Sequence, residues 1–255
     1  MPDTDGSRHL FGSTDKADSA GLPWAGRTFD SAPASTDDGS ADPALLAALI
    51  AFDAGHGSQR AVLEAFRAAR LLVPLLAHAG ELGEAADGHL VDKTQELSIA
   101  TVGAPDGRAV LPAFTSVATL SAWNSKARPV PAAGPRVALA AASEETQLIV
   151  IDPTSLTEFV LRRPMVTALA TGADWCEPWS DAEVVGAFRA SIAEETAVAG
   201  IELRAGDPHA RLAAAEVEVT LSIVVGLDAG ALRDLVQRVS ARWGSRPSSP
   251  SASTR

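Results

Sequence analysis

The 255-residue chain has one cysteine, no tyrosine and only 5% aromatic residues. A single thiol cannot form an internal disulfide or a multi-cysteine metal site, so both kinds of cross-link are excluded. No run of about 18 uncharged apolar residues occurs, which argues against a membrane-spanning helix. The first residues are acidic and lead into no apolar stretch, so the pattern of a secretory signal peptide is missing. We therefore expect a cytoplasmic protein with no membrane partner.

Positive charge is also scarce. The chain has 21 Lys and Arg against 32 Asp and Glu, which gives a net charge of −11 and an isoelectric point near 4.9. Nucleic-acid binding proteins neutralise phosphates with clustered Lys and Arg, so no nucleic-acid partner is expected. Hydrophobic residues make up 46% of the chain, enough for a folded core in one large domain or two small ones.

The two ends of the chain lack the apolar residues that a core needs. Residues 1–42 carry eight acidic and three basic side chains, a net charge of −5, among Gly, Ser, Thr, Ala and Pro. This composition predicts a disordered acidic arm. An artefact of the gene start is the alternative, and Trp24 and Phe29 leave a recognition role open. Residues 244–255 are predicted to form a disordered tail.

Residues 43–173 are predicted to form one domain of helices and hairpin strands. Pro43 suits the first position of a helix, because its missing N–H would be unpaired there, and Ser58 can cap the next helix. The apolar run 71–76 is typical of a strand, but Pro74 within it removes a ladder donor. We therefore expect this strand at the edge of a sheet or at a β-bulge.

Turn and cap signals alternate with short apolar segments in the rest of this domain. The turn triplet at 105–107 (PDG) predicts a hairpin between strands at 97–102 and 110–114. The other predicted elements are a helix from Thr115 or Ser116 to Trp123, a helix over 134–142, strands over 148–151 and 159–161, and a helix from Pro164 that ends at Gly172.

After a predicted linker at 174–180, residues 181–243 form a second pattern. Ser180 and Glu183 have the spacing of a capping box, and Asp228 can cap a final helix. Between the two helices, 201–205 and 217–225 alternate between apolar and polar residues. A helix–strand–strand–helix unit has an open β-edge and a marginal core, so we expect it to pack on the larger domain or to self-associate. Helices mixed with hairpins predict the α+β class.

The reactive side chains do not combine into a recognisable catalytic motif. His78 and His89 flank an acidic loop at 79–92 that could gather a metal, although a solvated loop is the ordinary reading. The segment 175–179 (WCEPW) resembles a thioredoxin-type motif but lacks the second cysteine, and the acids beside Cys176 oppose a reactive thiolate. No phosphate-binding glycine motif and no Gly-x-Ser-x-Gly elbow is present. We expect no cofactor and no metal site.

One short region stands out because it concentrates positive charge in an acidic protein. The residues concerned are Arg108, Trp123, Lys126, Arg128 and Arg136, with Phe114 and several prolines between them. A structural interpretation makes the arginine at 108 a hairpin tip and the two aromatic rings core residues. A functional interpretation makes the region a surface that binds an anionic ligand or an acidic peptide. Both interpretations stay open at this point.

The same region resembles the SseB family, in particular its N-terminal domain, over about residues 45–170. The matching segments are RLLVP at 70–74, DGR at 106–108, LPAFTS at 111–116, Leu120, Trp123, ARPVP at 127–131 and IDP at 151–153. Residues 181–243 are more weakly similar to the C-terminal domain of some members. The family supplies no agreed activity and no catalytic residues, so the resemblance implies none here. The Ala-, Arg- and Asp-rich composition suits an actinobacterial source.

These observations favour a non-catalytic cytoplasmic protein that binds an unknown protein or a small anionic ligand. The alternative is an enzyme of unrecognised type, a hydrolase or transferase that uses the acidic loop with His78 or His89. Convergence of these histidines with perturbed carboxylates in one pocket would favour the enzyme.

Overall fold

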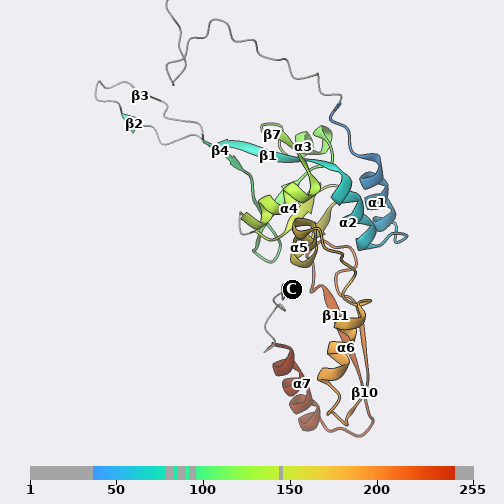
Figure 1. Ribbon diagram of the computed structural model, residues 1–255. Helices are drawn as coiled ribbons and strands as arrows, with labels where there is room; N and C mark the ends of the chain where they lie inside the picture. Colours follow the sequence, from blue (N-terminus) through green and yellow to red (C-terminus); the bar gives the residue numbers. More distant parts are fainter. Residues whose placement is uncertain (1–36, 79–82, 85–89, 92–95, 144–145, 245–255) are drawn as a thin grey trace, which may run out of the picture. The chain divides into compact units, whose positions relative to one another are not determined.

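The computed structural model describes residues 37–78, 83–84, 90–91, 96–143 and 146–244. Its elements (Figure 1) are α1 (Pro43–Asp53), α2 (Gln59–Ala68), β1 (Arg70–His78), β2 (Gly83–Glu84), β3 (Leu90–Val91), β4 (Glu96–Ile99), β5 (Val102–Gly103), β6 (Ala109–Ala113), α3 (Val117–Trp123), β7 (Arg128–Ala133), α4 (Gly134–Ser143), β8 (Ile149–Ile151), β9 (Phe159–Leu161), α5 (Arg163–Thr171), α6 (Ala182–Ser191), β10 (Val198–Ala205), β11 (Val217–Ile223) and α7 (Ala229–Gly244). This mixture of helices and small sheets confirms the α+β class. Within the described ranges no helix is both long and apolar enough to cross a membrane.

The helix boundaries of the first domain follow the predicted caps. Ser58 Oγ accepts a hydrogen bond from the Ala61 N–H at the start of α2. Ser116 and Thr119 form a reciprocal capping box at the start of α3, which satisfies backbone donors that a helix start leaves unpaired. Gly172 ends α5 in the left-handed conformation with φ of 72°, where a side chain would be strained.

The prediction for Pro74 is wrong, because β1 is the central strand of the sheet β4-β1-β7. Pro74 lies on the edge of β1 that faces β4, where its carbonyl accepts from the Ala100 N–H. On this edge of β1, Leu72 pairs with Phe114 and Leu75 pairs with Ile99 of β4. Pro74 lies in the gap between these two pairings. The missing N–H of Pro74 therefore removes one hydrogen bond at the end of the β1–β4 ladder. A central strand tolerates this loss.

Strand β7 was not predicted, because two prolines interrupt the segment RPVPAA. The hydrogen bond from the Gly134 N–H to the Ala69 carbonyl fixes which β7 residues bond to β1. In that register Pro129 and Pro131 lie opposite Pro74 and Leu72, at positions that make no ladder bond. Their nitrogens face the open edge of the sheet, the side on which proline is tolerated.

The second sheet has the order β5-β6-β8-β9. The predicted hairpin β8–β9 is present, and the Pro105–Gly107 turn joins β5 to β6. The strand predicted over 97–102 is divided, because Glu96–Ile99 pairs with β1 in the other sheet and Val102–Gly103 pairs with β6. However, β6 and β8 run parallel, so the expectation of hairpins alone is incomplete. Apolar residues of the inner face, among them Leu111, Ile149 and Phe159, pack with α1, α2, α4 and α5 in the main core.

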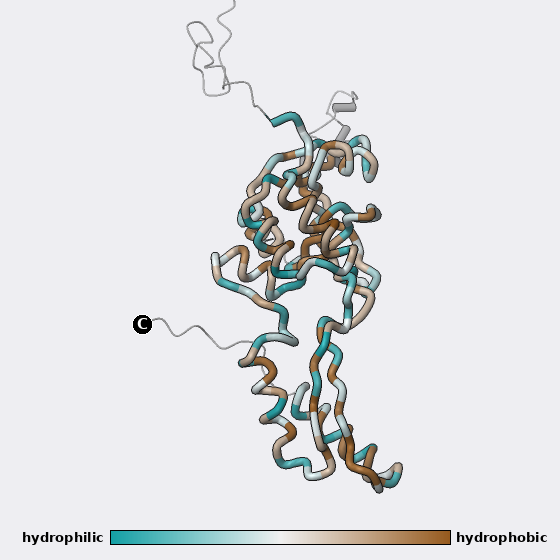
Figure 2. The backbone as a smooth tube through the Cα atoms, turned by 90° about the vertical axis from the view of Figure 1, so that its right-hand side faces the viewer, coloured by the Kyte–Doolittle hydropathy of each residue, from teal (hydrophilic) through white to brown (hydrophobic). Residues whose placement is uncertain are grey.

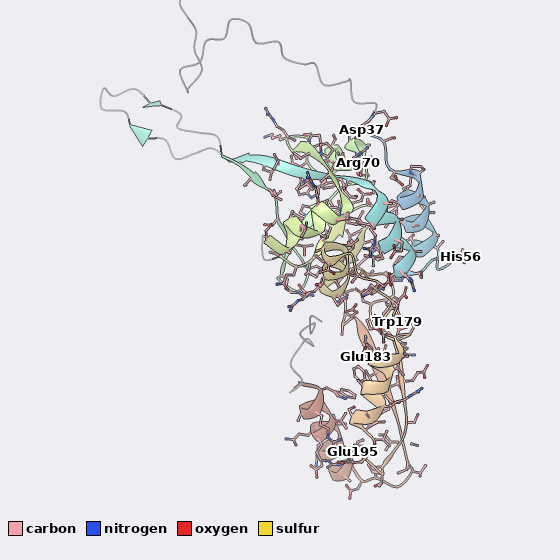
Figure 3. All side chains as sticks on the ribbon, viewed as in Figure 1. Asp37, His56, Arg70, Trp179, Glu183 and Glu195 are labelled. Atoms are coloured by element: carbon pink, nitrogen blue, oxygen red, sulfur yellow. The ribbon has the colours of Figure 1, made fainter. Side chains whose placement is uncertain are left out.

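Residues 181–244 form the predicted helix–strand–strand–helix order. The predicted capping box is displaced by one residue: Asp181, not Ser180, caps α6 by accepting from the N–H groups of Glu183 and Val184. Hydrophilic and hydrophobic residues alternate along both strands (Figure 2). Glu195, labelled in Figure 3, is buried after α6 and holds Arg238 and Arg242 of α7. Because Arg238 donates to it, the pKa of Glu195 lies below its usual value.

The described residues from Gly39 onward belong to one compact unit. The division into domains at 43–173 and 181–243, with a linker at 174–180, therefore stays a prediction. Residues 1–36 and 245–255, and most of the loop at 79–92, lie outside the described residues, and with them most of the predicted arm and most of the predicted tail. The last residues assigned to the arm, 37–42, are described: Asp42 caps α1, and the Ser40 carbonyl accepts from Arg70.

Candidate functional site

Arg108 lies at the tip of the β5–β6 hairpin and already has a partner. The Asp106 carboxylate accepts from the Arg108 backbone N–H at 3.1 Å, from Nε at 2.8 Å and from a terminal guanidinium nitrogen at 2.6 Å. The side-chain hydrogen bond from Arg108 lowers the pKa of Asp106. Both side chains are exposed, so the pair adds little stability, and it offsets the positive charge that the sequence suggested for a ligand.

The other predicted cations are exposed and make no ion pair among the described residues. Lys126 follows α3, Arg128 begins β7, and Arg136 lies in the first turn of α4. Arg128 and Arg136 are therefore separated by the length of β7, about 20 Å at the rise of a strand. The structure does not bring Arg136 together with Lys126 and Arg128, whereas the latter two lie two residues apart beside Trp123.

Trp123 is half-buried at the end of α3. Its ring lies 5.2 Å from that of Phe114, and it packs against the small cluster of Leu72, Leu120 and Ala127. The structural and functional interpretations of this residue are compatible, because one side of the ring contacts the core while the ring also lines a pocket.

That pocket lies on the outer face of the sheet β5-β6-β8-β9. Along these strands residues alternate between the two faces: Leu111 and Ile149 belong to the main core, while Val110 and Val150 face outward. The outer cluster consists of Val110, Leu148, Val150, Val160 and Leu212, with Val102 and Ala104 at its edge. These five residues are 2–6% exposed and none of them belongs to a described helix, although Trp123 at the end of α3 lines the depression beside them.

We call the depression on this face the Trp123 pocket; it measures about 230 Å³. Its lining residues are Val102, Gly103, Ala104, Pro105, Val110, Trp123, Val150, Pro153, Thr154, Glu158, Val160, Arg211 and Leu212. Sites for small molecules usually span about 300–1,000 Å³, so this pocket suits one large side chain better than a whole ligand.

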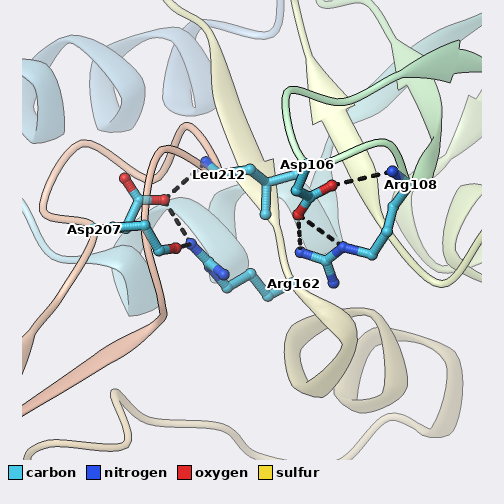
Figure 4. A network of polar contacts seen from close by, with 6 residues as sticks. Asp106, Arg108, Arg162, Asp207 and Leu212 are labelled. Atoms are coloured by element: carbon cyan, nitrogen blue, oxygen red, sulfur yellow. Dashed lines mark hydrogen bonds and ion pairs between the residues drawn. The ribbon is translucent and has the colours of Figure 1, made fainter.

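The segment 206–216, which joins β10 to β11, covers part of the same face. The buried Asp207 carboxylate accepts from Arg162 at 2.6 Å and from the Leu212 N–H at 2.8 Å (Figure 4). The Ala210 carbonyl accepts from Val160 of β9. Ala210 and Leu212 both have positive φ, a conformation that persists in such residues only when the surrounding contacts fix it. Leu212 is thereby held in the outer apolar cluster.

A larger cavity of about 530 Å³ lies beside the predicted linker, and it contains Cys176. Arg60, Asp174, Trp175 and Asp181 also line it. The pKa of the Cys176 thiol is raised, first by desolvation and then by its hydrogen bond to the Asp181 carboxylate at 3.4 Å. A thiol with a raised pKa stays protonated at neutral pH, so this cavity holds no activated nucleophile.

We therefore expect native Cys176 to react with iodoacetamide at pH 7 more slowly than the same thiol in urea. The variant Asp181→Asn removes a negative charge and should raise the rate, because the pKa falls and more thiolate is present at that pH. The rate is measured by mass spectrometry of the alkylated protein. Equal rates in the folded and unfolded protein would contradict the raised pKa.

The metal and enzyme hypotheses for His78 and His89 fall on side chains outside the described residues. The side chain of His78 and all of His89 lie outside the described residues, as do the acids of the loop between them. Where side chains are described, no group of three potential metal ligands occurs. His56 is exposed in the turn between α1 and α2 (Figure 3).

Sequence reasoning identified Trp123 but missed the floor of its pocket. Val110, Val150 and Val160 are only 2–6% exposed, so these short apolar strands are buried on both faces. Without polar residues that alternate along the strand, the sequence does not mark the face that carries the pocket. The sequence does not indicate that Leu212 covers the outer face. This contact depends on how a loop more than 50 residues further along the chain packs in the folded protein.

Comparison with known proteins identifies the first domain. The family model of the SseB protein N-terminal domain matches residues 45–168. This range contains the Trp123 pocket except for its two residues from the 206–216 segment. No curated protein and no solved structure matched the chain.

Proposed function

Since residues 45–168 are an SseB protein N-terminal domain, we propose that this chain is a non-catalytic, cytoplasmic protein-binding protein. In this proposal the Trp123 pocket takes one large apolar side chain of an extended protein segment. Acidic residues that flank that side chain face Lys126 and Arg128. The similarity of residues 181–243 to a family C-terminal domain remains part of the same proposal.

The observation that carries this proposal is an apolar depression on the outer sheet face, which the Trp123 ring and the loop residues Arg211 and Leu212 line. Leu212, from an irregular segment, already packs on this face, which supports an apolar side chain from an extended segment as the occupant of the pocket. Full burial of a second such side chain contributes about 1.5–3 kcal/mol of binding free energy before the cost of ordering the partner.

Charge supports an acidic partner at this place. The whole chain carries −11 and repels acidic peptides elsewhere. Lys126 and Arg128 are exposed without an ion pair in the described part of the chain, and Arg211 on the pocket wall has only a long contact of 3.6 Å with Asp53. These groups direct an acidic segment toward the pocket and add specificity more than affinity.

The lining of the Trp123 pocket has few polar side chains. Its polar side chains are Thr154, Glu158 and Arg211, and Glu158 Oε2 accepts from the Thr154 backbone N–H at 2.6 Å. That bond leaves the carboxylate engaged with the loop.

Random peptides displayed on phage provide a direct test with the full-length protein as bait. We expect enrichment of sequences with one Leu or aromatic residue next to Asp or Glu. An enriched synthetic peptide should bind Trp123→Ala at least tenfold more weakly by calorimetry, because the ring wall of the pocket is lost. The double variant Lys126→Glu, Arg128→Glu should weaken binding severalfold and reduce its dependence on salt.

Two matched controls make this test specific. Leu139→Ala removes an exposed apolar side chain from α4, and Arg136→Glu reverses a charge at the far end of β7. Both should leave peptide affinity unchanged. Peptides that lack an apolar anchor, or that bind Trp123→Ala as tightly as the parent protein, would refute the pocket as the binding site.

A further inference from the structure

Strand β10 presents an open edge whose free backbone groups can be assigned. Sheet β10-β11 has two strands within the described residues, so both outer edges are unpaired. The Gly206 N–H donates to the Glu216 carbonyl, which makes Gly206 and Glu216 a hydrogen-bonded pair. In an antiparallel ladder such pairs alternate with non-bonded ones. The N–H and C=O groups of Ile201, Leu203 and Ala205 therefore point away from β11.

The apolar face of the same two strands is incompletely covered. Its residues, among them Ile201, Leu203 and Leu221, are only half-buried although α6 and α7 lie in the same unit. Helix α6 has no fully buried residue at all. A two-stranded sheet is marginal by itself, whereas four strands with an apolar face form a stable layer.

We propose that two copies of this chain associate through antiparallel pairing of their β10 edges, with the two-fold axis at Leu203. In this register Leu203 pairs with Leu203 of the copy, and Ile201 pairs with Ala205 of the copy. The outward N–H and C=O groups assigned above then bond across the axis. The result is one four-stranded sheet, β11-β10-β10-β11, with a continuous apolar face beneath it.

The charges on the outer face select this register and this edge. Pairing centred on Leu203 places Glu202 opposite Arg204 of the copy, at a non-bonded position where side chains approach closely. Arg204, which now contacts Glu218 at 2.6 Å, then lies between two carboxylates. A register centred on Glu202 would instead oppose two glutamates. The outer face of β11 carries Glu218 as its single charged residue, so that edge has no complementary pair.

Two single charge reversals provide the test, with the full-length chain throughout. Sedimentation velocity from micromolar to several hundred micromolar should show a monomer–dimer equilibrium for the parent protein. Glu202→Arg opposes two arginines, and Arg204→Glu opposes two glutamates, so each variant alone should dimerise at least tenfold more weakly. An equimolar mixture should regain dimers, because each mixed pair restores both Glu–Arg contacts. Native mass spectrometry identifies them as heterodimers.

The control is Glu194→Arg, an exposed charge reversal outside β10, which should dimerise like the parent. Circular dichroism confirms that each variant is folded, and the mixing experiment gives a gain of assembly that misfolding cannot mimic. A parent protein that stays monomeric over the whole range would overturn the proposal. So would dimers that persist unchanged in both single variants, or mixtures that gain no heterodimer. None of these results bears on peptide binding at the Trp123 pocket.

Discussion

Replacing Asp207 by alanine should lower the free energy of unfolding by about 3–5 kcal/mol, because the largely buried Arg162 guanidinium loses its carboxylate partner and keeps the neutral Ala214 carbonyl. Asp207 is 4% exposed, and Arg162, which donates to it at 2.6 Å, is 12% exposed. The same carboxylate accepts from the Leu212 N–H, so the variant also releases the backbone that holds Leu212 on the outer sheet face. Chemical denaturation followed by tryptophan fluorescence measures the loss.

The matched control is Arg204→Gln, which removes an ion pair of the same 2.6 Å length between two exposed side chains. Water already solvates both partners there, so no measurable change in unfolding is expected at protein concentrations too low for the β10-edge dimer to form. A second readout separates the two roles of Asp207. If Leu212 covers the Trp123 pocket, Asp207→Ala should expose more apolar surface to a fluorescent dye such as ANS. Equal losses of unfolding free energy in Asp207→Ala and Arg204→Gln would mean that burial does not determine how much these two ion pairs stabilise the fold.

Local chemistry predicted the helices well because each boundary depends on a few neighbouring residues. Ser58, Ser116, Gly172 and Asp228 act at the helix ends for reasons that the sequence alone contains: a short oxygen side chain or a missing Cβ. The displacement from Ser180 to Asp181 shows the limit of that reasoning. Both residues can cap, and the choice depends on Ser180 donating instead to the Glu177 carbonyl.

Sheet order was harder to predict because it depends on distant residues. Pro74 in a central strand contradicts the rule that confines proline to edge strands, whereas the two prolines of β7 obey that rule because β7 is an edge strand. The rule fails for Pro74 because its nitrogen faces a gap. The parallel pairing of β6 with β8 has no local signal either, since about 35 residues separate the two strands.

The candidate site was predicted in part. The cluster of positive charge drew attention to the correct segment, and Trp123 lines the pocket found there. Proximity in sequence, however, grouped Arg108 and Arg136 with Lys126 and Arg128. The hairpin turn gives Arg108 its own carboxylate partner, and the length of β7 places Arg136 at the other end of a strand.

Replacing Asp152 by alanine is the second large effect that we expect, about 3–5 kcal/mol of unfolding free energy, because three hydrogen-bond donors lose one shared acceptor at once. Asp152 is 1% exposed and ends β8 with a positive φ of 43°. Its carboxylate accepts from the Thr115 N–H at 2.9 Å, from the Thr115 hydroxyl at 2.7 Å and from the Thr157 hydroxyl at 3.1 Å. Alanine would leave these buried donors unpaired and would fit the left-handed backbone less well than aspartate.

The variant Asp152→Asn keeps the size of the side chain and removes its negative charge, so it tests the two contributions to stability separately. Its carbonyl oxygen can still accept from the Thr115 N–H, and the threonine hydroxyls can turn to accept from the amide, so we expect about a third of the alanine effect. Thr115 directly precedes Ser116, the cap of α3, and α3 carries Trp123. Loss of Asp152 should therefore also weaken peptide binding at the pocket, in the order alanine more than asparagine. If both variants unfold like the parent protein, the IDP segment at 151–153 does not anchor α3, and the pocket wall must be held by the packing of Trp123 on Phe114 alone.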